Sequence, residues 1–146
     1  MSNTNEMMLV FDSKSENEGF ARVATAAFVA QLDPNMEELS DIKTAVSEAV
    51  TNCIIHGYQC KEGKITLKCK ITDNTVEIIV RDEGLGIEDI EKAMEPLYTT
   101  RPEMERSGMG FAFMEAFMDH LEVESELGSG TTITMRRTIK SCEVES

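Results

Sequence analysis

The sequence predicts an α+β fold, a two-layer α/β sandwich in which helices cover one face of a mixed, mainly antiparallel sheet. Apolar residues recur at helical spacing between residues 16 and 57. In two later pairs of segments, within residues 65–80 and 121–137, they alternate with polar residues. Such alternation is typical of antiparallel strands with one buried face, against which the helices bury their apolar stripes. At 146 residues, the chain is predicted to be a single domain, 1–146.

The first half of the chain predicts one strand and two helices. Residues 7–11 form a short apolar run suited to a strand, and residues 15–18 have the form of a capping box. The helix that begins there is expected to bury Phe20, Val23, Ala24, Ala27 and Phe28. Asp-Pro-Asn at 33–35 ends it. A second helix is expected from about Met36 to Gly57, with Gly57 as its C-cap, and its buried stripe is Leu39, Ile42, Val46, Ala49, Val50, Cys53 and Ile54.

The second half predicts two hairpins and one helix. Residues 65–71 and 76–80 alternate around the turn sequence Thr-Asp-Asn-Thr. Residues 121–125 and 131–137 flank a second turn at 127–130. Between the hairpins, residues 82–107 are rich in loop signals and residues 108–118 favour a helix.

Composition excludes several classes of protein. The formal net charge of −13 argues against nucleic-acid binding, which needs a basic surface. Neither a signal peptide nor an apolar run long enough to cross a bilayer is apparent, so we expect a cytoplasmic protein with no membrane partner. Cys53, Cys60, Cys69 and Cys142 form no C-x-x-C pair and are expected to be reduced thiols rather than zinc ligands.

Four short stretches carry residues suited to a nucleotide. In the first, Glu48, Asn52 and His56 are four residues apart and share one face of a helix. A carboxylate and a carboxamide stacked in this way can hold Mg²⁺, which prefers oxygen ligands. Taken alone, the same pattern is more often the solvated face of an amphipathic helix.

The second stretch, residues 82–87, follows a predicted strand. Asp82 can accept a hydrogen bond from an exocyclic amine such as that of adenine, and Gly84 and Gly86 let the main chain pass close to a flat ring. On its own, an ordinary glycine turn is the simpler interpretation.

The third and fourth stretches are also glycine-rich. Residues 107–111 lead into a helix whose free N–H groups suit phosphates, but a G-x-G is a weak signal and this is not a Walker A loop. In residues 128–132, Thr131 can offer a hydroxyl to a ligand or can be an ordinary strand residue.

In order and spacing, these four stretches resemble the N, G1, G2 and closing threonine motifs of the superfamily that includes gyrase, Hsp90, histidine kinases and MutL. The resemblance implies a Bergerat-type ATP-binding fold with ATP or ADP and Mg²⁺ as ligands. Residues 48–58, 96–103 and 105–111 further resemble the anti-sigma serine kinases of spore-forming bacteria. Residues 15–18 and 20–23 match that family as well, so the likeness covers nearly the whole chain.

The resemblance implies a role for each matching residue. Glu48 matches the general base that takes the proton of a substrate serine, and Asn52 matches the Mg²⁺ ligand. Asp82 matches the aspartate that reads adenine N6. Residues 95–107 match the ATP lid, in which Arg106 approaches the γ-phosphate. The other implied nucleotide contacts are Gly84, Gly86, Thr99, Thr100, Ser107, Gly108, Met109, Gly110 and Thr131.

The same resemblance implies activity and partners. Family members bind a sigma factor in the ATP state, phosphorylate an anti-anti-sigma protein on serine and form homodimers. Arg22 matches a partner-contact residue, although an exposed arginine on a solvated face is the plain alternative.

Two other functions are weighed against this one. A histidine kinase would need a phosphoacceptor histidine on a helical hairpin, but no histidine precedes Glu48. A nucleotide-gated protein-binding module without kinase activity is the second alternative. Glu48 discriminates, because a pure sensor needs no base at that position.

Overall fold

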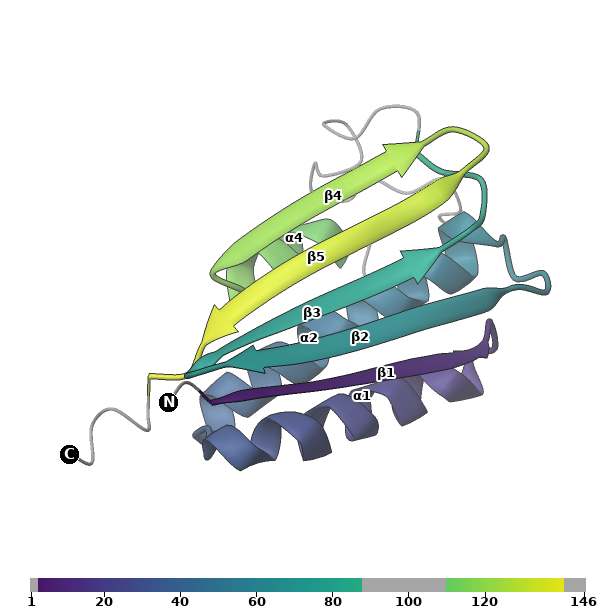
Figure 1. Ribbon diagram of the computed structural model, residues 1–146. Helices are drawn as coiled ribbons and strands as arrows, with labels where there is room; N and C mark the ends of the chain where they lie inside the picture. The colour runs from purple at the N-terminus through teal and green to yellow at the C-terminus, as the bar shows by residue number, and fades with distance from the viewer. Residues whose placement is uncertain (1–2, 88–109, 141–146) are drawn as a thin grey trace.

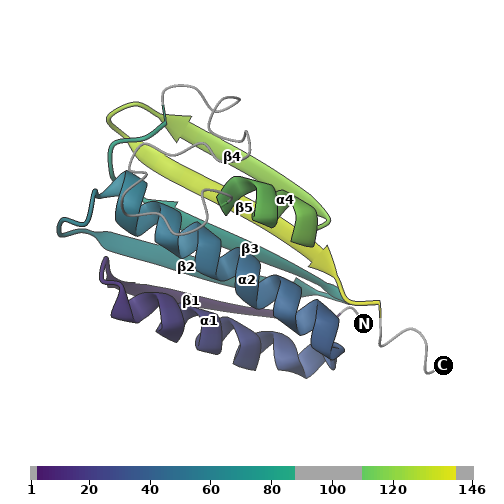
Figure 2. The ribbon, with the colours of Figure 1, turned by 180° about the vertical axis from the view of Figure 1, so that it is seen from behind.

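The structure is a computed structural model that describes residues 3–87 and 110–140. Its strands are β1 (Thr4–Asp12), β2 (Lys64–Thr72), β3 (Thr75–Asp82), β4 (His120–Glu126) and β5 (Gly130–Thr138). The helices α1 (Glu16–Val29), α2 (Met36–Asn52) and α4 (Gly110–Phe117) all lie on one face of the sheet (Figures 1 and 2). Short helical turns, η1 (Ala30–Leu32) and η2 (Cys53–Gly57), continue α1 and α2. The predicted two-layer α+β fold is confirmed.

The sheet has the strand order β1-β2-β3-β5-β4. All four pairings between the described strands are antiparallel, so the parallel component allowed by the prediction of a mixed sheet is not found among them. Strands β2 and β3 form the first predicted hairpin and β4 and β5 the second. Because β3 also pairs with β5, Asp82 lies opposite Thr131.

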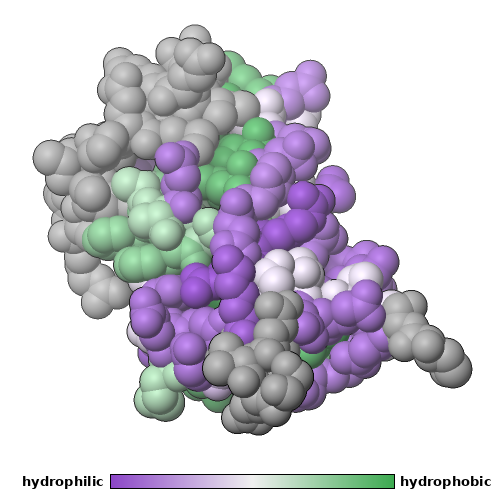
Figure 3. All heavy atoms as spheres, turned by 90° about the vertical axis from the view of Figure 1, so that its left-hand side faces the viewer, coloured by the Kyte–Doolittle hydropathy of each residue, from purple (hydrophilic) through white to green (hydrophobic). Residues whose placement is uncertain are grey.

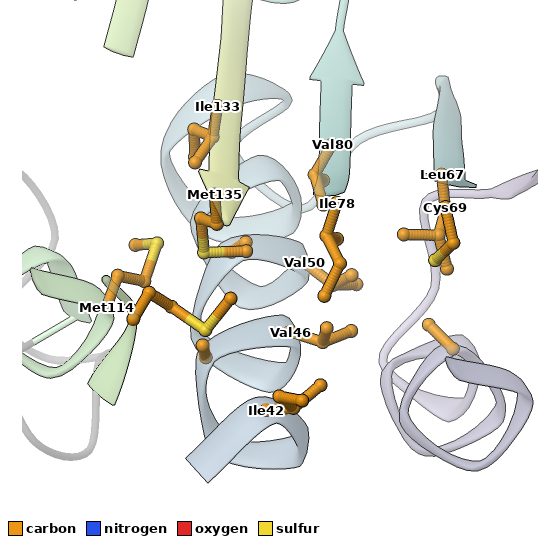
Figure 4. Packing of buried hydrophobic residues seen from close by; sticks show 14 of the residues in the cluster. Ile42, Val46, Val50, Leu67, Cys69, Ile78, Val80, Met114, Ile133 and Met135 are labelled. Carbon is orange, nitrogen blue, oxygen red and sulfur yellow. The ribbon is translucent and has the colours of Figure 1, made fainter. Parts of the chain in front are cut away.

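The core lies between the sheet and the helices. Alternate residues of β2 and β3 are buried, as the alternation predicts, and they meet the apolar stripe of α2 (Figure 4). Met114 of α4 and Met135 of β5 close the core on the other side. The residues shown in contact across this layer include Ile42, Val46, Val50, Leu67, Cys69, Ile78 and Val80.

The helix starts differ from the prediction. Ser15 precedes α1, but its side chain makes no capping hydrogen bond and its backbone is already helical. The capping box instead begins α2: Glu38 N donates to Asn35 Oδ1 at 2.7 Å, and Asn35 N donates to Glu38 Oε1 at 3.0 Å. Asn35 is extended at ψ 173°, which lets its side chain fold back over the first turn.

The predicted buried face of α1 is wrong: Phe20, Val23 and Ala27 are exposed, and Ala24 and Phe28 are only partly buried. Phe20 is 51% exposed and Val23 is 63% exposed, whereas the buried residues of α1 are Ala21, Thr25 and Val29. Helix α1 packs mainly against α2 at the edge of the sheet, so only a narrow stripe of small residues is covered.

The end of α2 also differs from the prediction. After Asn52 the chain widens into a π-helical turn, η2, in which Tyr58 N donates to Cys53 O at 2.9 Å. Tyr58, not Gly57, is the C-cap, and Gly57 is not among the residues with positive φ. A glycine is needed at position 57 because a side chain there would collide with Asp82, as described below.

One face of the molecule shows how hydrophilic and hydrophobic residues are distributed over the surface. Seen from the left-hand side of Figure 1, the described residues are mostly hydrophilic, with hydrophobic side chains in separate patches (Figure 3). Within residues 3–87 and 110–140, no helix combines the length and apolarity needed to span a bilayer.

Candidate functional site

The site is built around Asp82, the last residue of β3. Asp82 is 1% exposed, and its Oδ1 accepts a hydrogen bond from Gly84 N at 2.9 Å. Its other carboxylate oxygen, Oδ2, is buried and has no hydrogen-bond partner in the part of the chain that the structure describes. A buried acceptor without a donor is costly, so this oxygen marks a place where a ligand donor would be stabilising.

Burial changes the acid–base behaviour of this region. Burial raises the pKa of the Asp82 carboxyl, while hydrogen bonding from the main chain of Gly84, the thiol of Cys53 and the main chain of Thr131 acts in the opposite direction. The neighbouring thiol of Cys53 has a pKa well above its usual value, first because it is buried and then because of the Asp82 charge. Cys53 therefore stays a protonated thiol beside the carboxylate, as expected from the sequence.

Two glycines bring the end of α2 against the loop that follows β3. A Cβ on Gly57 would lie 2.7 Å from Asp82 Oδ2, and a Cβ on Gly84 would lie 2.1 Å from Gly57 O. Both distances are too short for any side chain. Gly57 O also accepts a hydrogen bond from Leu85 N at 2.9 Å, so the two segments touch through their main chains.

Two further glycines bring the loop against the β4–β5 turn. Gly86 has φ +78°, and a Cβ there would lie 2.2 Å from Glu126 O. Gly130 has φ +98°, and a Cβ there would lie 2.2 Å from Asp82 O. The main chain beside Asp82 thus packs closely at glycine positions where no Cβ fits, and the roles of Gly84 and Gly86 against a flat ring stay predictions.

Thr131 lies next to Asp82 and is 4% exposed. Its Oγ1 is 2.8 Å from Ser125 Oγ, which accepts a hydrogen bond from Ile87 N at 2.6 Å and donates to Gly130 O at 3.0 Å. Because Ser125 has one hydroxyl hydrogen, Thr131 is the donor in their shared bond. The lone pairs of Thr131 Oγ1 are left to accept from a ligand.

Sequence reasoning missed Ser125 and Tyr58. Ser125 holds Thr131 and Ile87 together, and Tyr58 Oη accepts from Glu83 N at 2.8 Å. Ser125 alternates within an ordinary strand pattern and Tyr58 follows a helix end, so neither carried a local signal. Their roles come from segments that are distant in sequence.

Glu48 and Asn52 lie one turn apart in the last part of α2, as predicted, and both are partly exposed. His56 is in η2, where bonds span five residues, so the four-residue spacing of an α-helix does not extend to it. Within residues 3–87 and 110–140 no group of three His, Cys, Asp or Glu side chains could hold a metal. A Mg²⁺ ion held through Asn52 would therefore need most of its oxygen ligands from water and substrate phosphates.

Several predicted positions fall outside the described residues: Thr99, Thr100, Arg106, Ser107, Gly108 and Met109. Gly110 is described and is the first residue of α4. Arg22 lies on α1, where Nη1 is 3.1 Å from Glu18 Oε1 and 3.4 Å from Ser47 Oγ of α2. Its side chain is 41% exposed, so it is both anchored and accessible.

Comparison with known proteins defines the class. The model of the histidine kinase-like ATPase domain family matches residues 11–137, most of the chain. Among solved structures, the fold is similar to the RsbU and RsbW domains of a Mycobacterium tuberculosis protein, with TM-score 0.67 and 20% identity over 92% of this chain and 32% of that one. It is also similar to the histidine kinase domain of a blue-light activated kinase from Erythrobacter litoralis EL346, with TM-score 0.56 and 17% identity over 87% and 63% of the two chains.

Relatives with high sequence identity define a narrower family within the histidine kinase-like ATPases. The chain is 64% identical to an anti-sigma F factor of Thermoanaerobacter sp. (strain X514) over 97% of this chain and 99% of the relative. It is 59% identical to an anti-sigma F factor of Clostridium novyi (strain NT) over 95% and 98% of the two chains. The chain belongs to the anti-sigma F factor family, within the histidine kinase-like ATPases.

Proposed function

We propose that this anti-sigma factor binds and inhibits a sporulation sigma factor, and that it uses Mg-ATP to phosphorylate an anti-anti-sigma protein on serine. The observation that carries the nucleotide part is the buried Asp82 Oδ2, which has no hydrogen-bond partner among residues 3–87 and 110–140 and lies against Gly57. An exocyclic amine has the hydrogens that this oxygen lacks. Adenine therefore matches the hydrogen-bonding character of this oxygen.

The pocket also favours adenine over bases that carry a carbonyl at the same position. Asp82 Oδ2 and Thr131 Oγ1 both accept. A carbonyl oxygen facing these two acceptors would be repelled, whereas an amino group satisfies one or both of them. This pair supports the expected specificity for ATP and ADP.

The phosphate end is assigned to the last turns of α2. Asn52 would hold Mg²⁺ through its side-chain oxygen, with Gly108 to Gly110 and Arg106 proposed around the phosphates. When bound, Mg-ATP supplies the γ-phosphoryl group and neutralises charge on it. Glu48, one turn before Asn52, would accept the proton as the serine oxygen of the partner bonds to phosphorus and ADP leaves.

Partner binding is supported by the family and by surface features. Large apolar side chains are exposed on β1, at Met8 and Val10, and on α1, at Phe20 and Val23. Exposed apolar groups of this size favour contact with another protein chain. We assign to the first two elements, with Arg22, a part in homodimer or sigma-factor contact.

The decisive experiment is transfer of labelled γ-phosphate from ATP, with Mg²⁺, to a serine-bearing anti-anti-sigma protein. Wild type and Glu48→Ala are compared, and ATP binding by each is measured separately. We expect transfer by wild type, none by the variant, and similar ATP affinity for both. Replacing the acceptor serine with alanine is the control and must abolish labelling.

Other outcomes separate the alternatives. If neither protein transfers phosphate but both bind ATP, the chain is a nucleotide-gated protein-binding module, and sigma binding should then still depend on nucleotide. If Glu48→Ala still transfers phosphate, the kinase assignment holds and Glu48 is not its base.

A further inference from the structure

The loop after β3 is held by hydrogen bonds at successive main-chain N–H groups. Glu83 N donates to Tyr58 Oη at 2.8 Å, Gly84 N to Asp82 Oδ1 at 2.9 Å, and Leu85 N to Gly57 O at 2.9 Å. Two of the acceptors are the side chain of Asp82 and the main-chain oxygen of Gly57. The third is the hydroxyl of Tyr58, a side chain from outside the loop, which holds Glu83, the first residue of the loop.

Tyr58 is itself fixed on two sides. Its hydroxyl donates to Lys64 O at 2.5 Å, at the first residue of β2. Its ring lies against Gly63, where an added Cβ would be 2.5 Å from the ring carbon Cε1. Burial raises the pKa of the phenol, so the hydroxyl keeps the hydrogen that it donates to Lys64 O. The single oxygen of Tyr58 therefore joins the start of β2 to the residue after Asp82.

This junction bears directly on the direction in which Asp82 points. Ile65, the residue after Lys64, is the register partner of Asp82. The hydroxyl thus ties the main chain on both sides of that pair, Lys64 on β2 and Glu83 beyond β3. Movement of Glu83 would shift Gly84, whose N–H holds Asp82 Oδ1 and so sets the direction of the carboxylate.

We propose that Tyr58 is a positioning residue for nucleotide binding, whose hydroxyl fixes the loop that holds the Asp82 carboxylate in its adenine-binding orientation. This inference rests on the proposed function, in which Asp82 contacts adenine. Tyr58 acts through Asp82 and touches neither nucleotide nor partner in this account.

The test is Tyr58→Phe, which removes one oxygen and keeps the ring on Gly63. We expect the Kd for ATP and for ADP to rise by the same factor, about threefold to tenfold, which is what loss of one hydrogen bond gives. The KM for ATP should rise by a similar factor while kcat stays near the wild-type value. The reason is that the loop after β3 lies where adenine is proposed to bind and not at the reacting phosphate.

Thr75→Val is the matched control. It removes a hydroxyl bond of similar length, the 3.0 Å contact of Thr75 Oγ1 with Thr138 Oγ1, at the other end of β3. We expect it to leave the Kd for ATP unchanged. Gly63→Ala is a second test of the same contact, because its added methyl would displace the Tyr58 ring. It should weaken ATP binding although the hydroxyl is retained.

A double-mutant cycle with Asp82→Asn separates positioning from a general structural effect. If Tyr58 acts through the Asp82 carboxylate, Tyr58→Phe should change the Kd by less than twofold once Asp82 is replaced. Equal effects of Tyr58→Phe in both backgrounds, or wild-type affinity of Tyr58→Phe itself, would overturn the proposal. Failure of the wild-type protein to bind ATP would instead overturn the proposed function on which it rests.

Discussion

Gly57 and Asp82 approach each other so closely that no side chain fits between them. A Cβ built on Gly57 lies 2.7 Å from Asp82 Oδ2, which is the oxygen left without a donor. The end of α2 and the end of β3 thus meet at the one atom that we assign to adenine. The same glycine was predicted to be a helix C-cap, but its small size serves this contact and not the helix end.

Gly57→Ala should therefore abolish most nucleotide binding. The new methyl must displace the Asp82 carboxylate, so we expect the Kd for ATP to rise at least about tenfold, as for loss of a hydrogen bond to a charged group. Isothermal titration with ATP and ADP measures it.

Gly19→Ala in α1 is the matched control. Apart from its chain neighbours and the backbone of its own helix, the contact that its Cβ would make among the described residues within 4 Å is with Arg22 Nη2, at 3.8 Å. We expect unchanged affinity and a gain in stability of about 0.5–1 kcal/mol, because alanine favours a helix. Wild-type affinity of Gly57→Ala would show that the methyl is accommodated elsewhere.

Asp82→Asn should weaken nucleotide binding without disturbing the fold. Asparagine keeps an oxygen for Gly84 N, but its amide hydrogens would face the amino group of adenine. We expect a loss on the order of 1–3 kcal/mol in ATP binding. Unchanged ATP affinity would remove Asp82 from the site.

The same variant should be more stable than wild type at neutral pH in the absence of nucleotide. The pKa of Asp82 is raised above its usual 3.8 by burial, so its contribution to stability is full below pH 3.8 and is lost as the pH rises through the folded-state pKa. Asparagine does not ionise, so the stability of the variant does not fall in this way as the pH rises.

Thermal melts of the two proteins between pH 3 and pH 8 test this expectation. The difference in Tm should favour Asp82→Asn at pH 7 and shrink as the pH falls towards 3.8. A difference in Tm that stays constant between pH 3 and pH 8 would mean that burial of the ionised Asp82 carboxylate does not lower the stability of the folded protein.

The two helix starts offer a stability prediction with its own control. Asn35→Ala should destabilise the protein by about 1 kcal/mol, because it breaks the capping box of α2. Ser15→Ala should cost much less, because Ser15 makes no capping hydrogen bond. Urea unfolding of both variants gives the comparison, and equal losses would contradict it.

The hairpin of β2 and β3 was predictable because both strands are buried on one face. Ile65 to Ile71 and Val76 to Val80 alternate without interruption, so this hairpin and its turn were correctly placed. Helix α1 was harder to read. Phe20 and Val23 remain exposed because α1 packs at the edge of the sheet, and no local pattern shows which side of a helix has a neighbour.

The place of a candidate residue was predictable where it follows from the residue's own element. Asp82 at the end of β3 and Glu48 one turn before Asn52 in α2 are examples, and their roles stay predictions. Gly57 and Ser125 could not be assigned, because their roles depend on contacts with segments 25 to 38 residues away in the chain. The two caps show the same limit: Ser15 and Asn35 have similar sequence signals, and only the backbone angle at each decides which one works.

The pairing of β3 with β5 sets when the site comes into existence during folding. Each hairpin can close locally, but Asp82 and Thr131 meet only when the two hairpins join across a long stretch of chain. Contacts of this kind form slowly because their loop must close first. A nucleotide that needs both residues has nothing to bind in either hairpin alone, so it should prolong the lifetime of the folded protein while leaving the speed of folding unchanged.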